Sequence, residues 1–265
     1  MLNRRLCGIA AIILFLALLY LLTMPTQYLV GNEENEFRSA ASGAWYLRSR
    51  HLLTTPFYQS VLRVNPLLGI RPESFIVVQI ANILFGLACA VVLYATLRSL
   101  QAPYGLSIAF TALAGISFGM WEHSFCSHVS IHPQFFHVIS IYLLVKYLTA
   151  PGRSGWTLVT ALAAGCTSAL FASYYAMFVP LMMLIVLWDW KRRRDIPLVR
   201  LLLIFVLVAA LVGVAPFVAA AWAQGYRSPS GFVTYMASVP RYTARLQPIL
   251  KSFGPERWTR SVAGA

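Results

Sequence analysis

The sequence predicts an all-α protein that crosses a membrane several times. Three observations support this fold class. Hydrophobic residues make up 59% of the 265 residues and charged residues only 11%, whereas soluble domains average about 25% charged residues. The mean hydropathy is +0.69. The apolar residues also form continuous runs, unlike the alternating apolar and polar positions of membrane barrel strands.

The Lys and Arg residues of the chain lie mainly at the ends of these apolar runs. The net charge is +13, and charges placed beside spans set the orientation of a membrane protein. There is no basic stripe with a nucleic-acid motif, so we do not expect nucleic acid as a partner. Cys7, Cys89, Cys126 and Cys166 lie in or beside apolar runs without C-x-x-C spacing, which is typical of buried thiols.

One apolar run is too long for a single span. The 35 residues 156–190 would form a helix of roughly 52 Å, and a hydrocarbon core is about 30 Å thick. The basic cluster 191–194 and the N-terminal Arg4 and Arg5 are both expected in the cytoplasm. An even number of crossings must therefore separate them, and a break near residues 173–175 provides it.

We expect seven spans in one membrane domain that covers residues 1–265. The first is interpreted as a retained anchor, because no A-x-A-like cleavage site follows it. The N-terminus is then cytoplasmic, and the loop 25–74 and the segment 222–265 are external. The segment 222–265 is basic, so we expect anionic lipid head groups beside it. The predicted spans are about 6–24, 75–97, 104–121, 133–149, 156–172, 174–190 and 198–221.

Three of the eight acidic residues gather just after the first span, at Glu33, Glu34 and Glu36. The apolar residues that follow recur at helical spacing, which predicts interfacial helices in the external first loop. Asn32 would cap the first of them. Acids in its first turn would each stabilise it by about 0.3–1 kcal/mol through the helix dipole. A purely structural role is therefore one interpretation of these carboxylates.

Three short motifs support a second interpretation. The stretch EENEF at residues 33–37 is similar to D-E-x-x-Y, and HLLTTPFY at 51–58 keeps the His, Pro and Tyr of H-P-P-G-Y-P-L-Y. Trp121 and His128 have the spacing of W-x6-E-V-Y. These motifs, in this order, resemble the GT-C superfamily of integral-membrane glycosyltransferases, which includes protein mannosyltransferases and lipid A aminoarabinose transferases. The chain would correspond to the seven-span module that this superfamily shares.

The resemblance implies that a sugar moves, with inversion, from a polyprenyl-phosphate-linked donor to a glycan, lipid or protein acceptor on the external face. A first-loop carboxylate would be the base, with Glu33 at the Asp position and Glu34 and Glu36 as alternatives. Membrane lipids are further partners, and a bacterial inner membrane is the expected location. The residues expected at the substrates are His51, Tyr58, Glu122, His128, Arg38 and Arg241.

Four histidines occur within fifteen residues, at His123, His128, His132 and His137. His128 and His132 have the i, i+4 spacing of helical metal ligands. Pro133 disfavours helical geometry at His132, so we predict no metal ligands, although a divalent cation stays open as a cofactor. The remaining interpretations are histidines that line a carrier or acceptor site, or ordinary residues at the membrane boundary.

A non-catalytic protein with the same fold is the alternative function. It would be an assembly subunit that binds a membrane partner, or a lipid-binding or transport component. A transporter is the less favoured of these, because we find no inverted repeat or paired broken helices. Few ionisable residues occur in the middle of the predicted spans.

Overall fold

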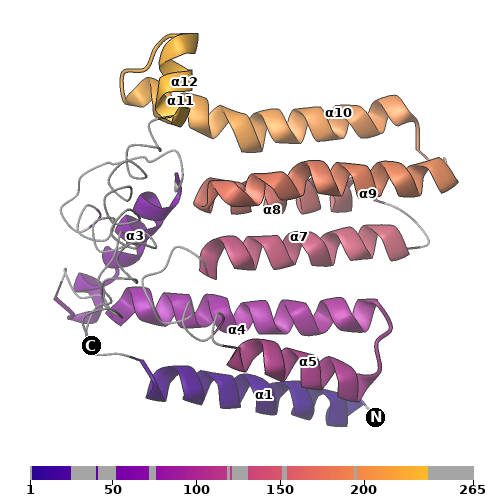
Figure 1. The fold of residues 1–265 in the computed structure, drawn as a ribbon. Coiled ribbons are helices and arrows are strands. Elements are labelled where there is room, and N and C mark those ends of the chain that lie inside the picture. The colour runs from indigo at the N-terminus through magenta and orange to yellow at the C-terminus, as the bar shows by residue number, and fades with distance from the viewer. Residues whose placement is uncertain are drawn as a thin grey trace, which may run out of the picture. The chain divides into compact units, whose positions relative to one another are not determined.

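The computed structural model describes residues 2–24, 40, 52–71, 76–117, 120, 131–150, 154–193 and 196–237. Within these ranges every regular element is a helix, which confirms the predicted all-helical class. The helices are α1 (Leu2–Leu22), α3 (Thr54–Leu62), η1 (Pro66–Leu68), α4 (Ile76–Ser99), α5 (Tyr104–Ile116), α7 (Ile131–Thr149), α8 (Gly155–Phe171), η2 (Ser173–Met177), α9 (Phe178–Arg193), α10 (Leu198–Val208), η3 (Ala209–Val214), α11 (Ala215–Ala223) and α12 (Pro229–Ala237) (Figure 1).

Three of the helices in the described ranges are long and apolar enough to cross a membrane. They cover Ile76–Ser99, Ser173–Arg193 and Leu198–Ala223. Shorter apolar helices cover Cys7–Leu22, Tyr104–Ile116 and Gly155–Phe171. Helix α7 is less apolar, because polar side chains occupy its first half. A helix therefore stands at each predicted span, while the crossing of the membrane by all seven stays a prediction.

The chain divides into two compact units, residues 1–216 and 217–265. In the second unit, Gly225 turns the chain with φ +89° before α12. Ser228 caps α12, because its Oγ accepts a hydrogen bond from Gly231 N at 2.9 Å. The rings of Tyr226 and Tyr235 lie 5.7 Å apart. The prediction of one membrane domain for the whole chain stays a prediction.

The predicted break in the long apolar run is confirmed. Helix α8 ends at Phe171, and Ala172 has an extended backbone with φ −150° and ψ 110°. The short 3₁₀ helix η2 follows, and α9 begins at Phe178. The extended backbone at Ala172 interrupts the helical hydrogen bonds, so the chain can reverse its direction there.

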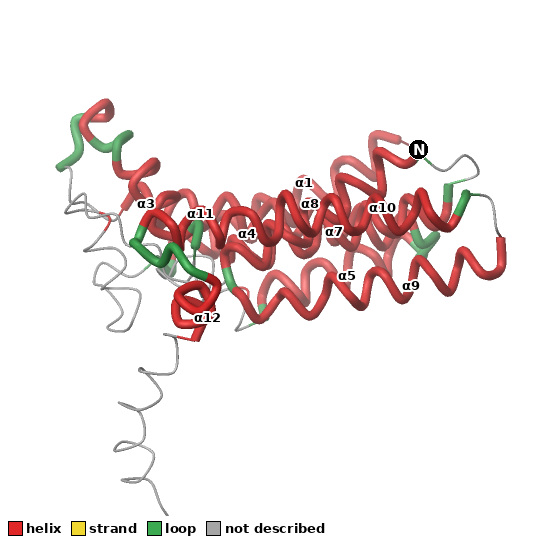
Figure 2. Tube along the Cα trace, turned by 90° about the horizontal axis from the view of Figure 1, so that it is seen from above, coloured by secondary structure: helices red, strands yellow, loops and turns green. Residues whose placement is uncertain are grey.

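Hydrogen bonds between α7 and α8 fix the relative directions of these two helices. Ser168 Oγ donates to Pro133 O at 2.8 Å, and Ser140 Oγ donates to Ala161 O at 2.6 Å. Positions later in α7 thus meet positions earlier in α8, so the two helices are antiparallel. In both views the long helices of this unit lie with their axes along a common direction (Figure 2).

Helices α8 and α10 run in the same direction. A Cβ added at Gly155, the first residue of α8, would lie 3.8 Å from Arg200 Nη2 near the start of α10. One added at Gly213, in η3, would lie 3.5 Å from Cys166 Sγ near the end of α8. Because α9 connects these two parallel helices, it must run back in the opposite direction (Figure 1).

Helices α1 and α5 are also parallel. A Cβ added at Gly8 would approach the Tyr104 ring, and one added at Gly115 would lie 2.5 Å from Leu16 Cδ1. Tyr20 Oη donates to Gly115 O at 2.7 Å. A short turn joins α4 to α5, which makes these packed helices antiparallel. Chain direction therefore alternates along α1, α4, α5, α7, α8, α9 and α10 (Figure 1).

This alternation gives the first unit two ends, and the described residues at these two ends differ in charge. We call the end that holds the start of α1 the basic end, and the opposite one the far end. Described Lys and Arg residues at the far end are Arg63 and Arg71. Those at the basic end are Arg4, Arg5, Arg98, Lys146, Lys191, Arg192, Arg193 and Arg200. Such asymmetry is typical of a membrane protein whose basic end is cytoplasmic.

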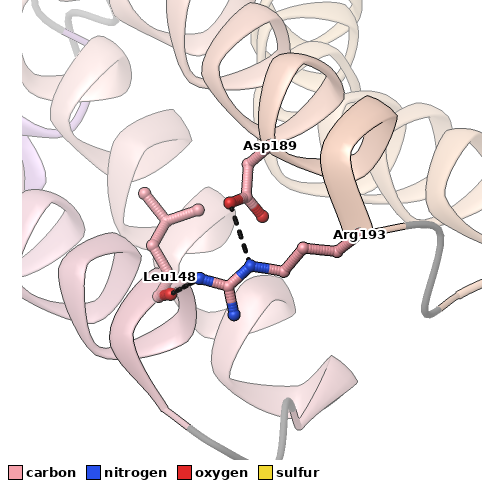
Figure 3. Close-up of polar contacts among 3 residues, drawn as sticks. All are labelled: Leu148, Asp189 and Arg193. Atoms are coloured by element: carbon pink, nitrogen blue, oxygen red, sulfur yellow. Dashed lines mark hydrogen bonds and ion pairs between the residues drawn. The ribbon is translucent and has the colours of Figure 1, made fainter.

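Arg193 connects α9 to α7 at the basic end (Figure 3). Its Nη2 donates to Leu148 O at 3.3 Å, and its Nε lies 3.4 Å from Asp189 Oδ1. The side chain is half exposed, so the ion pair contributes only about 0.2–1 kcal/mol. Trp190 Nε1 also donates to Ile196 O at 2.7 Å. These contacts fix the end of α9 and the path of the chain into α10.

The close approach of α1 and α5 makes Gly115→Ala a test of their packing. Leu16 is fully buried, so it has little room to move away from a new methyl group. We expect the substitution to destabilise the protein by about 1–3 kcal/mol through overpacking, measured by thermal unfolding in detergent.

Gly105→Ala is the matched control on the same helix, because a Cβ there would meet no atom within 4 Å. It should be neutral or slightly stabilising, since Ala has the higher helix propensity. Equal effects of the two substitutions would contradict the packing of α1 against α5.

Candidate functional site

One of the predicted site residues, Tyr58, lies in the described part of the chain. The others lie outside the described residues, and their roles stay predictions. They are Glu33, Glu34, Glu36, Arg38, His51, Glu122, His128 and Arg241. The site is therefore built here from Tyr58 and from the described side chains around it.

Tyr58 lies on α3, which packs on α4. The buried residues of α3 recur at helical spacing, so one face of this short helix is turned inward. Tyr58 is fully buried and belongs to a hydrophobic cluster with Ala40, Leu62 and Val78. Just before α3, Leu53 N donates to Leu170 O at 3.2 Å. Helix α3 is thus attached to both α4 and the last turn of α8.

His132 lies inside α7, and the expectation that Pro133 would keep it out of a helix is wrong. Helix α7 begins at Ile131, so Pro133 is its third residue. In the first turn the missing N–H of a proline costs no intrahelical hydrogen bond. The carbonyl of Pro133 instead accepts the hydrogen bond from Ser168, which holds the start of α7 against α8.

Aromatic rings from three other helices surround His132. Its ring centroid lies 4.2 Å from Phe57, 4.9 Å from Phe85 and 6.1 Å from Tyr58. Phe171 stacks on it at 5.4 Å with an interplanar angle of 22°. Because these residues come from α3, α4 and α8, they bring four helices together at one point. We call these five residues the His132 cluster.

The His132 cluster contains buried polar atoms without partners. His132 is 0% exposed, and neither of its ring nitrogens has a hydrogen-bond partner within the described part of the chain. The same is true of Oγ1 of the buried Thr54, at the start of α3. An unsatisfied buried polar group costs about 1–3 kcal/mol. The fold therefore keeps an imidazole where an apolar ring would be more stable.

The chemistry that His132 offers follows from its surroundings. No acidic side chain among the described residues forms an ion pair with it. An imidazole removed from water without such a partner is neutral, because a buried unpaired charge is far more costly. A neutral imidazole presents one N–H donor and one acceptor nitrogen. His132 can thus bind a group that both donates and accepts a hydrogen bond.

A second histidine lies further along α7, at the turn between α8 and α9. The ring of His137 is 4.1 Å from Phe178 and 5.0 Å from Tyr175. Tyr175 in turn lies 4.7 Å from the exposed Tyr174. Within the described ranges, no three His, Cys, Asp or Glu side chains come together to hold a metal ion.

The aromatic partners of His132 were not predicted from the sequence. Phe57 precedes Tyr58 in the stretch 51–58, and Phe171 comes just before the predicted break. Phe57 lies within the predicted first loop, and Phe171 lies at the end of a predicted span. Their common position on the predicted external side is the signal that could have associated them with the histidine-rich stretch.

No family model, curated protein or solved structure matches the chain. The resemblance to the GT-C superfamily therefore stays a prediction, and it is carried by the motif residues alone.

Phe171→Ala tests whether the cluster holds the far end together. Phe171 is 5% exposed and contacts His132, Phe57 and Phe136. Removing a buried Phe ring costs about 3–5 kcal/mol, so we expect a clearly lower unfolding temperature in detergent. Phe110→Ala is the control, because Phe110 on α5 is 53% exposed and should have little effect. A Phe171→Ala protein as stable as Phe110→Ala would contradict the cluster.

Proposed function

We propose that this protein is an integral-membrane glycosyltransferase of the GT-C type. It moves a sugar from a polyprenyl-phosphate-linked donor to an acceptor on the external face of the membrane, with inversion. Seven helices cross the bilayer, with the basic end in the cytoplasm of a bacterial cell. Glu33 is the proposed base, and Glu34 and Glu36 are the alternatives.

One observation carries this proposal: two stretches that are far apart in the sequence are both connected to helices at the same end of the first unit. Residues 25–39 follow the end of α1, and residues 121–130 lie between the end of α5 and the start of α7. All three helix ends belong to the far end of the first unit. The same end holds the His132 cluster. The proposed carboxylate-bearing stretches and a buried binding residue would then share one side of the membrane.

The proposed reaction is a displacement at the anomeric carbon of the donor sugar. An acceptor hydroxyl oxygen forms a new bond to that carbon, and the bond from carbon to phosphate oxygen breaks. The phosphate leaves with the bonding electron pair, and the acceptor proton moves to the Glu33 carboxylate. This transfer requires the carboxylate within about 2.6–3.2 Å of the acceptor oxygen.

The leaving phosphate and the lipid chain need two further features. Donors such as Arg38 and Arg241 would stabilise the charge that develops on the phosphate oxygens. The polyprenyl chain needs apolar surface between or along the spans. Exposed apolar side chains of α4 and α5, such as Leu84 and Leu113, provide apolar surface of this kind.

A non-catalytic carrier-binding or assembly component is the second candidate. It is favoured by the composition of the His132 cluster, whose five residues offer contacts for binding and no carboxylate for proton transfer. In this alternative the donor is held but not cleaved, and a membrane partner subunit carries out the chemistry.

Replacement of the three first-loop carboxylates separates the two candidates. In cells that lack the gene, wild-type protein should restore a glycan that mass spectrometry detects. We expect Glu33→Gln to reduce transfer by about 10²–10⁴-fold, as for other general bases, because glutamine cannot accept the proton. Glu34→Gln and Glu36→Gln should have smaller effects.

Glu73→Gln is the matched control, because it neutralises a carboxylate later in the same predicted loop that has no proposed role. It should restore wild-type transfer. Full transfer by all three first-loop variants would refute the enzymatic proposal, and co-purification with a stoichiometric partner would then favour the alternative.

A further inference from the structure

The buried imidazole of His132 has a cost that the fold itself does not explain. Its neighbours are aromatic rings, and its two nitrogens have no partners within the described residues. Thr54 Oγ1, on the helix that also carries Phe57, is buried in the same unsatisfied state. These three buried atoms have no hydrogen-bond partner among the described residues, and a bound ligand is one group that could supply partners to them.

We propose that His132 binds a hydroxyl group of the sugar on the lipid-linked donor. This proposal rests on the proposed function and specifies how the donor is recognised. The His132 cluster contacts the sugar of the donor and not its phosphate. His132 then determines which glycosylated carriers the protein accepts.

The composition of the cluster favours a sugar over the other parts of the donor. A sugar hydroxyl donates and accepts hydrogen bonds, as does a neutral imidazole. The described cluster holds no Lys or Arg, which a phosphate would need. A hydrocarbon chain would leave the imidazole unsatisfied. Aromatic rings with a few polar groups are typical of sites for small ligands.

Helix α3 is the element that can admit the ligand. The cluster is closed, since His132 and Tyr58 are fully buried. Helix α7 packs along both α4 and α8, whereas the nine-residue α3 adds only Phe57 and Tyr58 to the cluster. Its attachment to α8 includes the hydrogen bond from Leu53 N to Leu170 O. A shift of α3 would therefore expose the imidazole without unpacking the longer helices.

The test is a binding measurement on the full chain in lipid nanodiscs. The probes are the polyprenyl-phosphate esters of mannose, glucose and 4-aminoarabinose, with bare polyprenyl phosphate for comparison. His132→Phe removes both polar atoms and keeps a planar ring. His132→Leu serves if the larger ring does not fit, and His132→Gln restores a donor and an acceptor. Tyr142→Phe is the control on the same helix, because it also removes a polar group and keeps the ring, and Tyr142 lies outside the cluster.

We expect wild-type protein to bind at least one glycosylated probe more tightly than the bare carrier. His132→Phe should weaken this binding at least about tenfold, or about 1.4 kcal/mol, with unchanged affinity for bare carrier. His132→Gln should recover part of the loss, and Tyr142→Phe should behave as wild type. The His132→Phe protein should also unfold at the same or a higher temperature, because an unsatisfied group is gone.

Three results would overturn the inference. They are an equal loss of affinity for bare and glycosylated carrier, no loss at all, or a wild-type protein that binds no glycosylated probe more tightly than bare carrier. A lower unfolding temperature for both His132→Phe and His132→Leu, without loss of sugar affinity, would make the imidazole structural and satisfied by a buried water.

The two proposals fail in different ways. If the sugar-specific loss occurs but all first-loop Gln variants transfer normally, His132 binds sugar in a protein without the proposed base. If Glu33→Gln abolishes transfer while His132→Phe binds sugar normally, the enzyme stands and the role of His132 is wrong.

Discussion

The reversal of the chain at Ala172 is the constraint on which the arrangement of the first unit depends. A helix continuous through residues 156–190 would be much longer than a bilayer is thick, and it would carry the basic end of α9 to the wrong side. The extended backbone at Ala172 returns the chain toward the end from which α8 came. As a result, Lys191, Arg192 and Arg193 join Arg98 and Lys146 at one end, and the His132 cluster lies at the other.

The sequence predicted the helices well because their cause is local. Run length and hydropathy define each helix, and the bilayer's thickness implied the break that Ala172 provides. The site was predicted poorly because it depends on tertiary contacts. A proline disfavours helical geometry at the residue before it, so we expected His132 to lie outside a helix. His132 is helical because Pro133 lies in the first turn of α7. Phe85 and Phe171 look like ordinary core residues until four helices bring them onto His132.

Stability and function make opposite demands at the His132 cluster. The rings around His132 stabilise the far end, where α3, α4, α7 and α8 meet. The imidazole among them lowers that stability, because its nitrogens have no partner in the described chain. Natural proteins accept such a loss where a ligand later supplies the partner. A carbohydrate carried on a lipid would reach this end from the membrane, beside the first-loop carboxylates proposed as base.

Cysteine labelling at the two ends of α8 tests the seven-span arrangement most directly. In a protein whose four native cysteines are replaced by alanine, Ser154→Cys precedes α8 and Tyr174→Cys follows it, and both positions are exposed. In intact cells, a membrane-impermeant maleimide should label Tyr174→Cys and leave Ser154→Cys unlabelled until the cells are permeabilised. Labelling of both positions from outside, or of Ser154→Cys alone, would contradict a chain that crosses the membrane through α8 and turns back at Ala172.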